Sequence, residues 1–224
     1  MLLIGAGCTR SGTTDWLTTG SDPGNSRYSA LTQINRRNVA NLRVAWTYRS
    51  GDLPAGGGQI QATPIVVDGI LYTTTPALAV VALRADSGTL VWRFEPPTGR
   101  SKGPSWSQVN RGVVHWASGD DARIFFTAGR FLYALDARTG RSIPSFGDSG
   151  SVDLAGGLSR DIGDAFLIAS SPGVIYEDLL IQGTRVGEDE GSAPGDVRAY
   201  DVRTGAMRWT FHTIPHPGEF GHET

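Results

Sequence analysis

Few residues of this chain are of a type that could do chemistry, and one loop stands out among them. Glu188, Asp189 and Glu190 follow one another, and carboxylate oxygens are the hard ligands that Ca²⁺ prefers. Because Ca²⁺ takes several such oxygens, one acidic loop is weak support for a metal site, and a solvated loop explains the same run. The pattern leaves both interpretations open and identifies no catalytic residue.

The single cysteine, Cys8, needs its own explanation, since one cysteine cannot form an internal disulfide. It follows an apolar run, residues 2–4, and the small residues 5–7, an arrangement similar to the end of a bacterial lipoprotein signal. We therefore expect residues 1–14 to be a truncated lipoprotein signal and linker, with a lipid anchor at Cys8 in the cell envelope. A thiol without that role is the alternative.

The elements that position these groups are indicated by a threefold repeat. The stretches 82–94, 134–146 and 199–211 spell nearly the same pattern, in which a Ser-Gly or Thr-Gly turn is followed by aromatic residues. Self-similarity at a period of tens of residues indicates stacked or radially arranged units. The spacing is roughly that of a four-stranded propeller blade of 40 to 50 residues with long loops added.

Each copy is expected to be the end of one strand, a turn and the start of the next strand. Further two-residue turns precede the copies: Asp68-Gly69 lies between the apolar runs 64–67 and 70–74, and Glu177-Asp178 lies between 173–176 and 179–183. Only a polar stretch at 31–42 hints at a helical period. The sequence therefore predicts an all-β chain with the architecture of a β-propeller.

The tryptophans of the repeat are interpreted as structural. A large flat side chain after the turn is placed to wedge between neighbouring blades, burying on the order of 200 Å². We therefore expect Trp92 and Trp209 in the core, whereas the second copy has Pro144 at this place and is expected to dock more loosely. Asp136 and Asp201 are expected to accept hydrogen bonds from the backbone of their turns.

The composition fits a turn-rich β protein, with 30 Gly, 12 Pro and a net charge of −2. This balance offers no concentration of positive charge for nucleic acid, so nucleic acid is excluded as a partner. No apolar run is long enough to span a membrane.

Segments outside the repeat carry a family resemblance. They are Asp15-Trp16, Arg27-Tyr28-Ser29 and Gln33-Ile34-Asn35, then the run 63–72, then Asn110-Arg111-Gly112, and finally Phe211-His212-Thr213-Ile214-Pro215 with Pro217-Gly218-Glu219. From about Asp15 to Thr224 the chain resembles the N-terminal part of the pyrroloquinoline quinone (PQQ)-dependent dehydrogenases, the quinoprotein glucose/alcohol dehydrogenase family. These are eight-bladed propeller enzymes of the bacterial periplasm.

The resemblance implies a PQQ- and Ca²⁺-dependent enzyme that oxidises an alcohol or a glucose-type sugar and passes electrons to a quinone or a cytochrome. It implies that residues 15–224 are a partial propeller of about three blades that continues beyond 224. The general base would then lie further along, and the fragment itself would be inactive. A periplasmic location, with a lipid anchor at Cys8, follows from the same resemblance.

The resemblance also identifies residues that would bind the cofactor. Arg111 matches an arginine that contacts a cofactor carboxylate, and Gln61 matches a position that hydrogen-bonds the cofactor. The alternatives are a solvated surface arginine and an ordinary strand-edge glutamine. Ser170 and Thr184-Arg185 match segments whose polar groups touch the cofactor.

Two further positions resemble the family less closely. Glu188 falls within one residue of a calcium ligand of the alcohol enzymes. Relatives that oxidise methanol or ethanol carry adjacent cysteines where this chain has Ser105-Trp106, so Trp106 would cover the quinone face or lie on a blade surface. Membrane glucose dehydrogenases have His at the place of Trp116, and their substrate therefore cannot be transferred to this chain.

A non-catalytic scaffold is the alternative function. An envelope lipoprotein propeller that helps to assemble outer-membrane barrels shares the Asp-x-x-Thr-Gly-x-x-x-Trp repeat and a lipidated cysteine. It lacks the segments 27–29, 110–112 and 211–219, which favours the enzyme.

Overall fold

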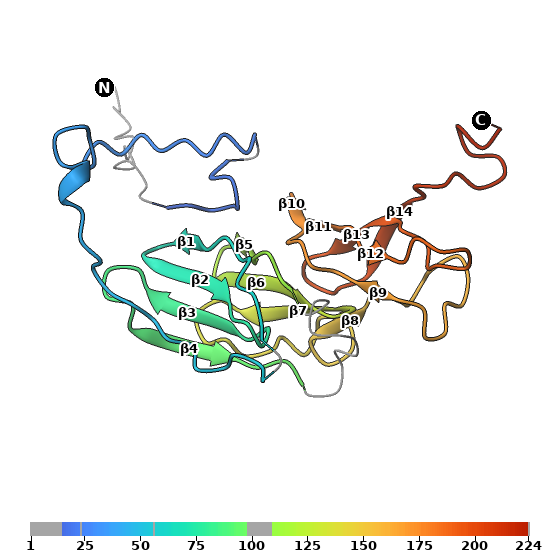
Figure 1. The fold of residues 1–224 in the computed structure, drawn as a ribbon. Coiled ribbons are helices and arrows are strands. Elements are labelled where there is room, and N and C mark those ends of the chain that lie inside the picture. The colour runs from blue at the N-terminus through green and yellow to red at the C-terminus, as the bar shows by residue number, and fades with distance from the viewer. Residues whose placement is uncertain (1–14, 23, 56, 98–108, 224) are drawn as a thin grey trace, which may run out of the picture.

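The computed structural model describes residues 15–22, 24–55, 57–97 and 109–223, and these form three four-stranded antiparallel sheets with one two-stranded ribbon. The predicted all-β propeller architecture, with about three blades, is confirmed. Figure 1 shows the sheets following one another along the chain. No helix in the described ranges has the length and apolar character needed to cross a bilayer.

The strands follow the order expected of blades, since each sheet is antiparallel and keeps the chain order of its strands, with β12 alone left out of the third sheet. The first sheet contains β1 (Ile65–Val67), β2 (Ile70–Thr74), β3 (Val80–Arg84) and β4 (Leu90–Phe94). The second contains β5 (Val114–Ser118), β6 (Asp121–Ala128), β7 (Phe131–Asp136) and β8 (Ser151–Asp153). The third contains β10 (Val174–Tyr176), β11 (Leu179–Gln182), β13 (Val197–Asp201) and β14 (Met207–Phe211), while β9 (Leu167–Ile168) pairs with β12 (Arg185–Val186).

The turn signals lie where the sequence predicts them. Asp68 (φ 50°) and Gly69 (φ 74°) close the β1–β2 hairpin in the left-handed conformation that its twist requires. Glu177 (φ 52°) begins the β10–β11 turn in the same way. The stretch 31–42 contains only a short 3₁₀ turn, η1 (Val39–Asn41), so its weak helical period produces no α-helix.

The core lies between the sheets. Ile124 and Phe126 of β6 belong to a cluster shared with the first sheet, whereas Phe125 belongs to a cluster shared with the third. Because successive side chains of a strand point to opposite faces, an unbroken apolar run is what a sheet covered on both faces needs. The second sheet is therefore the buried middle layer of the described structure.

Tryptophan docking is confirmed at the first sheet. Trp92 is buried and donates its indole N–H to the carbonyl of Ala137 at 2.9 Å, and Trp46 donates in the same way to Ala85 at 3.1 Å. A Cβ on Gly140 would lie 2.5 Å from the Trp92 ring. The glycine of the repeat therefore leaves room for the indole of the preceding unit.

Trp209 does not follow this pattern, and its prediction as a core residue was wrong. This residue is 40% exposed. The indoles of Trp46 and Trp92 each donate to the turn of the following unit, whereas no turn among the described residues covers Trp209.

The second copy docks through other groups than an indole. Phe146 is fully buried against Phe125, with ring centroids 5.5 Å apart, and Gly147 donates its N–H to the carbonyl of Thr204. The carbonyl of Val202, which corresponds to that of Ala137, accepts from the guanidinium of Arg123 at 3.0 Å. Phe146, Gly147 and Arg123 thus make the contact between the second and third units that an indole makes between the first two. The prediction of looser docking was wrong.

The turn aspartates have the predicted role. Oδ1 of Asp136 accepts from the backbone N–H groups of Arg138 and Thr139 at 3.1 and 2.8 Å. Oδ1 of Asp201 accepts in the same way from the two residues at the matching positions, Arg203 and Thr204. These bonds fix the turn on which the preceding unit packs.

Candidate functional site

The loop before β5 is held by one buried amide. Oδ1 of Asn110 accepts from the backbone N–H of Gly112 at 2.7 Å and from the hydroxyl of Thr74 at 3.1 Å, and Nδ2 donates to the carbonyl of Thr127 at 2.9 Å. Gly112 has φ 142°, and a Cβ there would lie 2.9 Å from the carbonyl oxygen of Thr63. The sequence Asn-Arg-Gly thus places Arg111 on a rigid support between two blades.

The backbone of Arg111 is hydrogen-bonded to the segments that precede the first strands of the two other sheets. Its carbonyl accepts from the N–H of Thr63, just before β1, and its N–H donates to the carbonyl of Ser170, shortly before β10. The guanidinium Nη1 donates to the hydroxyl of Ser170 at 3.1 Å and to that of Ser171 at 3.5 Å. No ion pair within the described segments uses Arg111, so its charge is available to an anionic ligand.

A cavity of about 430 Å³ opens at this guanidinium. Four residues predicted from the sequence line it together: Arg111, Ser170, Thr184 and Arg185. They come from the loop before β5, the segment before β10, the turn after β11 and the start of β12. The structure therefore brings together residues that are far apart in the sequence.

One wall of the cavity carries a polar group without a partner. The Thr184 hydroxyl oxygen is buried and makes no hydrogen bond within the described part of the chain. Leaving such a group unsatisfied costs about 1–3 kcal/mol, which a polar ligand atom would recover. With the guanidinium of Arg111 and the hydroxyls of Ser170 and Ser171, this group fits a ligand that bears carboxylates and ring oxygens.

Gln182 also lines this cavity, and the sequence did not single it out. Its side chain is buried, and Nε2 donates to the carbonyls of Ser171 and Gly183 at 3.2 and 2.8 Å. The signal available in the sequence is a polar residue at the end of an otherwise apolar strand, β11. Its role is to hold the two backbone segments that form the cavity wall.

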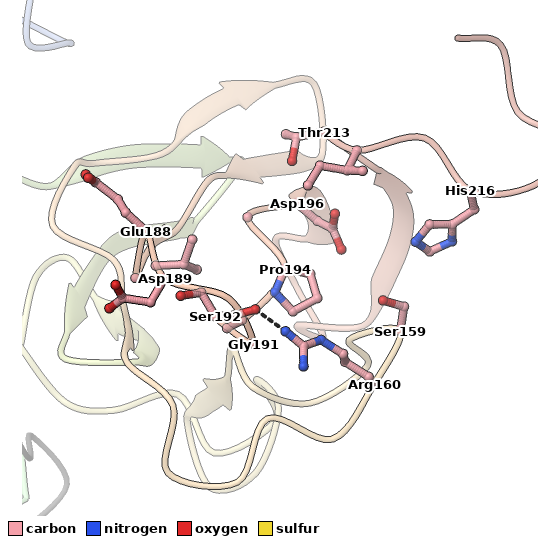
Figure 2. A pocket seen from close by; sticks show the side chains of 15 residues that line it. Ser159, Arg160, Glu188, Asp189, Gly191, Ser192, Pro194, Asp196, Thr213 and His216 are labelled. Atoms are coloured by element: carbon pink, nitrogen blue, oxygen red, sulfur yellow. Dashed lines mark hydrogen bonds between the residues drawn. The ribbon is translucent and has the colours of Figure 1, made fainter. Parts of the chain in front are cut away.

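Three predicted site residues are not placed at this cavity. The exposed Gln61 donates to Oε1 of Gln59 and is not among the lining residues, although its neighbour Thr63 bonds to Arg111. Trp106 lies outside the described residues. Glu188 is exposed at a second cavity of about 550 Å³, which Asp189 also lines (Figure 2).

The second cavity contains a buried carboxylate that the sequence did not single out. Asp196 is only 4% exposed, and its Oδ2 has no hydrogen-bond partner among the described residues. Figure 2 shows this side chain across the cavity from Glu188. Among the described residues, no group of three metal-ligating side chains includes Glu188, so the structure does not assemble side-chain ligands around it.

Comparisons with known proteins agree with this geometry. The family model described as "PQQ: Glucose/ethanol/alcohol dehydrogenase, beta-propeller domain" matches residues 16–224. Quinohemoprotein alcohol dehydrogenase ADH-IIG of Pseudomonas putida is 36% identical over 203 residues, which are 90% of this chain and 26% of the relative. Quinate/shikimate dehydrogenase (quinone) of Acinetobacter baylyi is 34% identical over 227 residues, covering 88% of this chain and 27% of the relative.

Solved structures give the same result. Quinohemoprotein alcohol dehydrogenase of Comamonas testosteroni superposes with a TM-score of 0.73 and 30% identity, over 92% of this chain and 28% of that one. A europium-containing methanol dehydrogenase superposes with a TM-score of 0.67 and 27% identity, over 90% of this chain and 32% of that one. The chain thus spans about a quarter of the length of the curated relatives it matches. Since the family model covers almost all of its residues, the chain belongs to the PQQ-dependent glucose/ethanol/alcohol dehydrogenase β-propeller family.

Proposed function

We propose that this chain forms part of the quinone site of a PQQ-dependent dehydrogenase that oxidises the CH–OH group of an alcohol or a glucose-type sugar. The observation that carries the proposal is the guanidinium of Arg111, which faces a cavity lined by hydroxyl groups and has no carboxylate partner within the described segments. The relatives, which are alcohol and quinate/shikimate dehydrogenases, support this substrate class.

The residues of the cavity bind and orient the cofactor in this proposal. Arg111 binds a cofactor carboxylate through charge-assisted hydrogen bonds, which are the stronger kind. Thr184 and Ser170 hydrogen-bond its polar edge, while Arg185 and Gln61 remain proposed contacts and Trp106 a proposed cover of the ring. PQQ, when bound, supplies an acceptor for the two electrons that leave the substrate carbon. We assign the general base to none of the described residues.

We also propose that Ca²⁺ accompanies the quinone, with Glu188 as one of its carboxylate ligands. The metal in the europium-containing methanol dehydrogenase supports an ion in this type of site. The position of Glu188 at the second cavity, away from Arg111, does not support an ion at the quinone. We derive no step of the reaction through the ion. We expect a chelator to weaken PQQ binding to the purified protein and added Ca²⁺ to restore it. Unchanged affinity after removal of Ca²⁺ would exclude this part.

The remaining parts of the proposal rest on the resemblance. We propose a quinone or a cytochrome as the electron acceptor, a periplasmic location and acylation of Cys8, which lies outside the described residues. Residues 1–14 are the proposed signal and linker, and 15–224 the proposed partial propeller of a longer enzyme. We do not propose the scaffold role, because the dehydrogenase family model matches residues 16–224.

Replacing Arg111 with alanine is expected to weaken PQQ binding by about 10- to 100-fold. A hydrogen bond to a charged group contributes roughly 1.5–3 kcal/mol, and each 1.36 kcal/mol is a factor of ten. The PQQ affinity of Arg111→Lys is expected to lie between those of the unaltered protein and Arg111→Ala, since lysine keeps the charge but not the planar fork of donors. The measurement is equilibrium titration of the full-length enzyme with PQQ, followed by its dye reduction with a panel of alcohols and sugars.

Arg138→Ala is the matched control, because Arg138 is an exposed arginine that donates to the carbonyl of Asp120, away from the cavity. We expect it to bind PQQ as the unaltered protein does. If Arg111→Ala binds PQQ normally, or if Arg138→Ala loses as much affinity, the proposed site is wrong.

A further inference from the structure

The segment that follows β14 brings two histidines and a glutamate together. One ligand atom of each of His212, His216 and Glu219 lies within 4.8 Å of the others. The two imidazole rings stack, with centroids 3.8 Å apart and planes 20° apart. Oε1 of Glu219 is 2.8 Å from Nδ1 of His212, and Oε2 accepts the backbone N–H of His216 at 2.7 Å.

The backbone of this segment holds the three side chains in place. Glu219 donates its N–H to the carbonyl of His216 at 2.9 Å, and His222 donates its N–H to the carbonyl of Glu219 at 3.2 Å. Pro215 and Pro217 flank His216 and fix φ on both sides of it. These bonds order the backbone between His216 and His222, which lowers the entropy cost of bringing His216 and Glu219 to one ion.

The chemistry of the three groups indicates which ligand they would take. Two imidazole nitrogens and one carboxylate oxygen are a set that suits Zn²⁺ and similar divalent transition metals, whereas Ca²⁺ takes six to eight oxygens. Two protonated imidazoles in contact would repel each other, but two neutral ones can bind a cation through their lone pairs. Tetrahedral bonds of about 2.0–2.2 Å place ligand atoms on the order of 3.3 Å apart, so the three ligand atoms must move closer and the stacked rings must turn until their lone pairs meet at one ion.

We propose that His212, His216 and Glu219 bind one divalent transition-metal ion of the Zn²⁺ class. None of the three lines the Arg111 cavity, so the site is separate from the quinone site and does not depend on the proposed function. His216 lies at the edge of the second cavity, as Figure 2 shows, which leaves a fourth coordination position accessible to water. A bound ion would cross-link the segment 212–219 through its three ligands.

Titration of the purified, metal-free protein with Co²⁺ tests the site, because tetrahedral Co²⁺ absorbs in the visible. We expect one equivalent to bind, the visible band to appear and Zn²⁺ to displace it. Since an ion that binds only the folded state stabilises it, the melting temperature is also expected to rise with added Zn²⁺. Absence of a stoichiometric band in the unaltered protein would overturn the proposal.

Variants separate ligation from general folding. His216→Ala and Glu219→Gln are each expected to lower Co²⁺ affinity by more than the roughly 10–100-fold that the loss of an outer-shell partner costs. Glu219→Gln keeps the shape of the side chain, so it tests the ligand if His216→Ala folds poorly. The control is His222→Ala, which removes an exposed imidazole of the same segment whose one hydrogen bond among the described residues is to the carbonyl of Pro215. An equal loss of affinity in this control would contradict the assignment.

Discussion

Replacement of Trp92 with alanine is expected to lower the free energy of unfolding by about 3–5 kcal/mol, the range for buried aromatic-to-alanine changes. The indole is 8% exposed, and its ring centroid lies 5.8 Å from that of Tyr72. Its N–H bond to the carbonyl of Ala137 would be lost, although the Tyr72 hydroxyl also donates to that oxygen, at 3.2 Å. Burial raises the pKa of Tyr72 to about 12, so this donor keeps its proton. Urea unfolding followed by circular dichroism measures the change.

The same contact can be tested from the glycine side. Gly140→Ala and Gly119→Ala both place a side chain at a positive φ, of 69° and 59° respectively. Only the Cβ at Gly140 would meet the Trp92 ring, whereas that at Gly119 meets nothing within 4 Å. We expect Gly140→Ala to lose about 1–3 kcal/mol more stability than Gly119→Ala, the usual cost of overpacking. Equal losses of stability in the two variants would mean that the Trp92 ring does not pack closely on the turn at Gly140.

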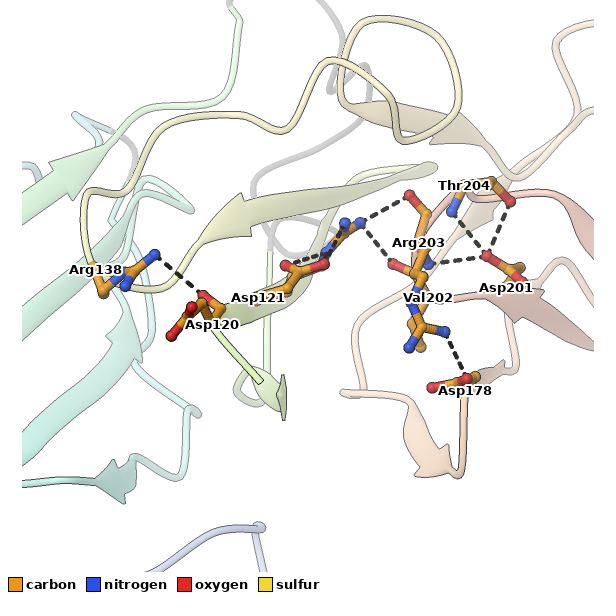
Figure 3. Close-up of polar contacts among 9 residues, drawn as sticks. Asp120, Asp121, Arg138, Asp178, Asp201, Val202, Arg203 and Thr204 are labelled. Atoms are coloured by element: carbon orange, nitrogen blue, oxygen red, sulfur yellow. Dashed lines mark hydrogen bonds and ion pairs between the residues drawn. The ribbon is translucent and has the colours of Figure 1, made fainter. Parts of the chain in front are cut away.

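Replacement of Arg123 with alanine is expected to lower the free energy of unfolding by about 3 kcal/mol. The side chain is 8% exposed, and Nη1 donates to the carbonyls of Val202 and Arg203 at 3.0 and 2.8 Å. Nη2 pairs with Asp121 at 2.7 Å, and this hydrogen bond is the main reason why the pKa of Asp121 is lowered. Figure 3 shows these contacts between the second and third sheets. Without the guanidinium, the two carbonyls and one carboxylate lose their donor.

Arg84→Ala is the control for Arg123→Ala. Arg84 also pairs with a nearby aspartate, Asp86, at 3.0 Å, but both side chains are more than half exposed. Exposed pairs contribute little because water and salt screen them. We therefore expect little change in the urea midpoint of Arg84→Ala, and a comparable drop in both variants would show that Arg123 does not join the sheets.

The repeat was sufficient to predict the sheets, because alternation and turn residues are local signals. It was not sufficient for the docking of the second copy, since Arg123 and Val202 are 79 residues apart and no local pattern links them. The prediction that Trp209 is buried was wrong for a related reason. The exposure of an indole depends on the unit that packs on it and not on its own repeat. Local signals thus describe each blade better than the contacts between blades.

The candidate site shows the same division. The family resemblance indicates Arg111, Ser170, Thr184 and Arg185, and these meet at one cavity because the segments that carry them lie beside neighbouring sheets. Glu188 is only three residues from Arg185, yet it lines another cavity. The β12 strand, Arg185–Val186, carries the chain from one cavity to the other, and sequence spacing does not reveal such a change of side.

The hydrogen bonds of Asn110 link two features that look independent in the sequence. One amide binds the first sheet through Thr74, the second through Thr127, and the backbone beside the Arg111 guanidinium. The position of the Arg111 charge therefore depends on how the first and second sheets are oriented relative to each other. A change at Thr74 or Thr127 would therefore be transmitted through Asn110 to the backbone that carries the Arg111 guanidinium, without altering a residue that lines the cavity.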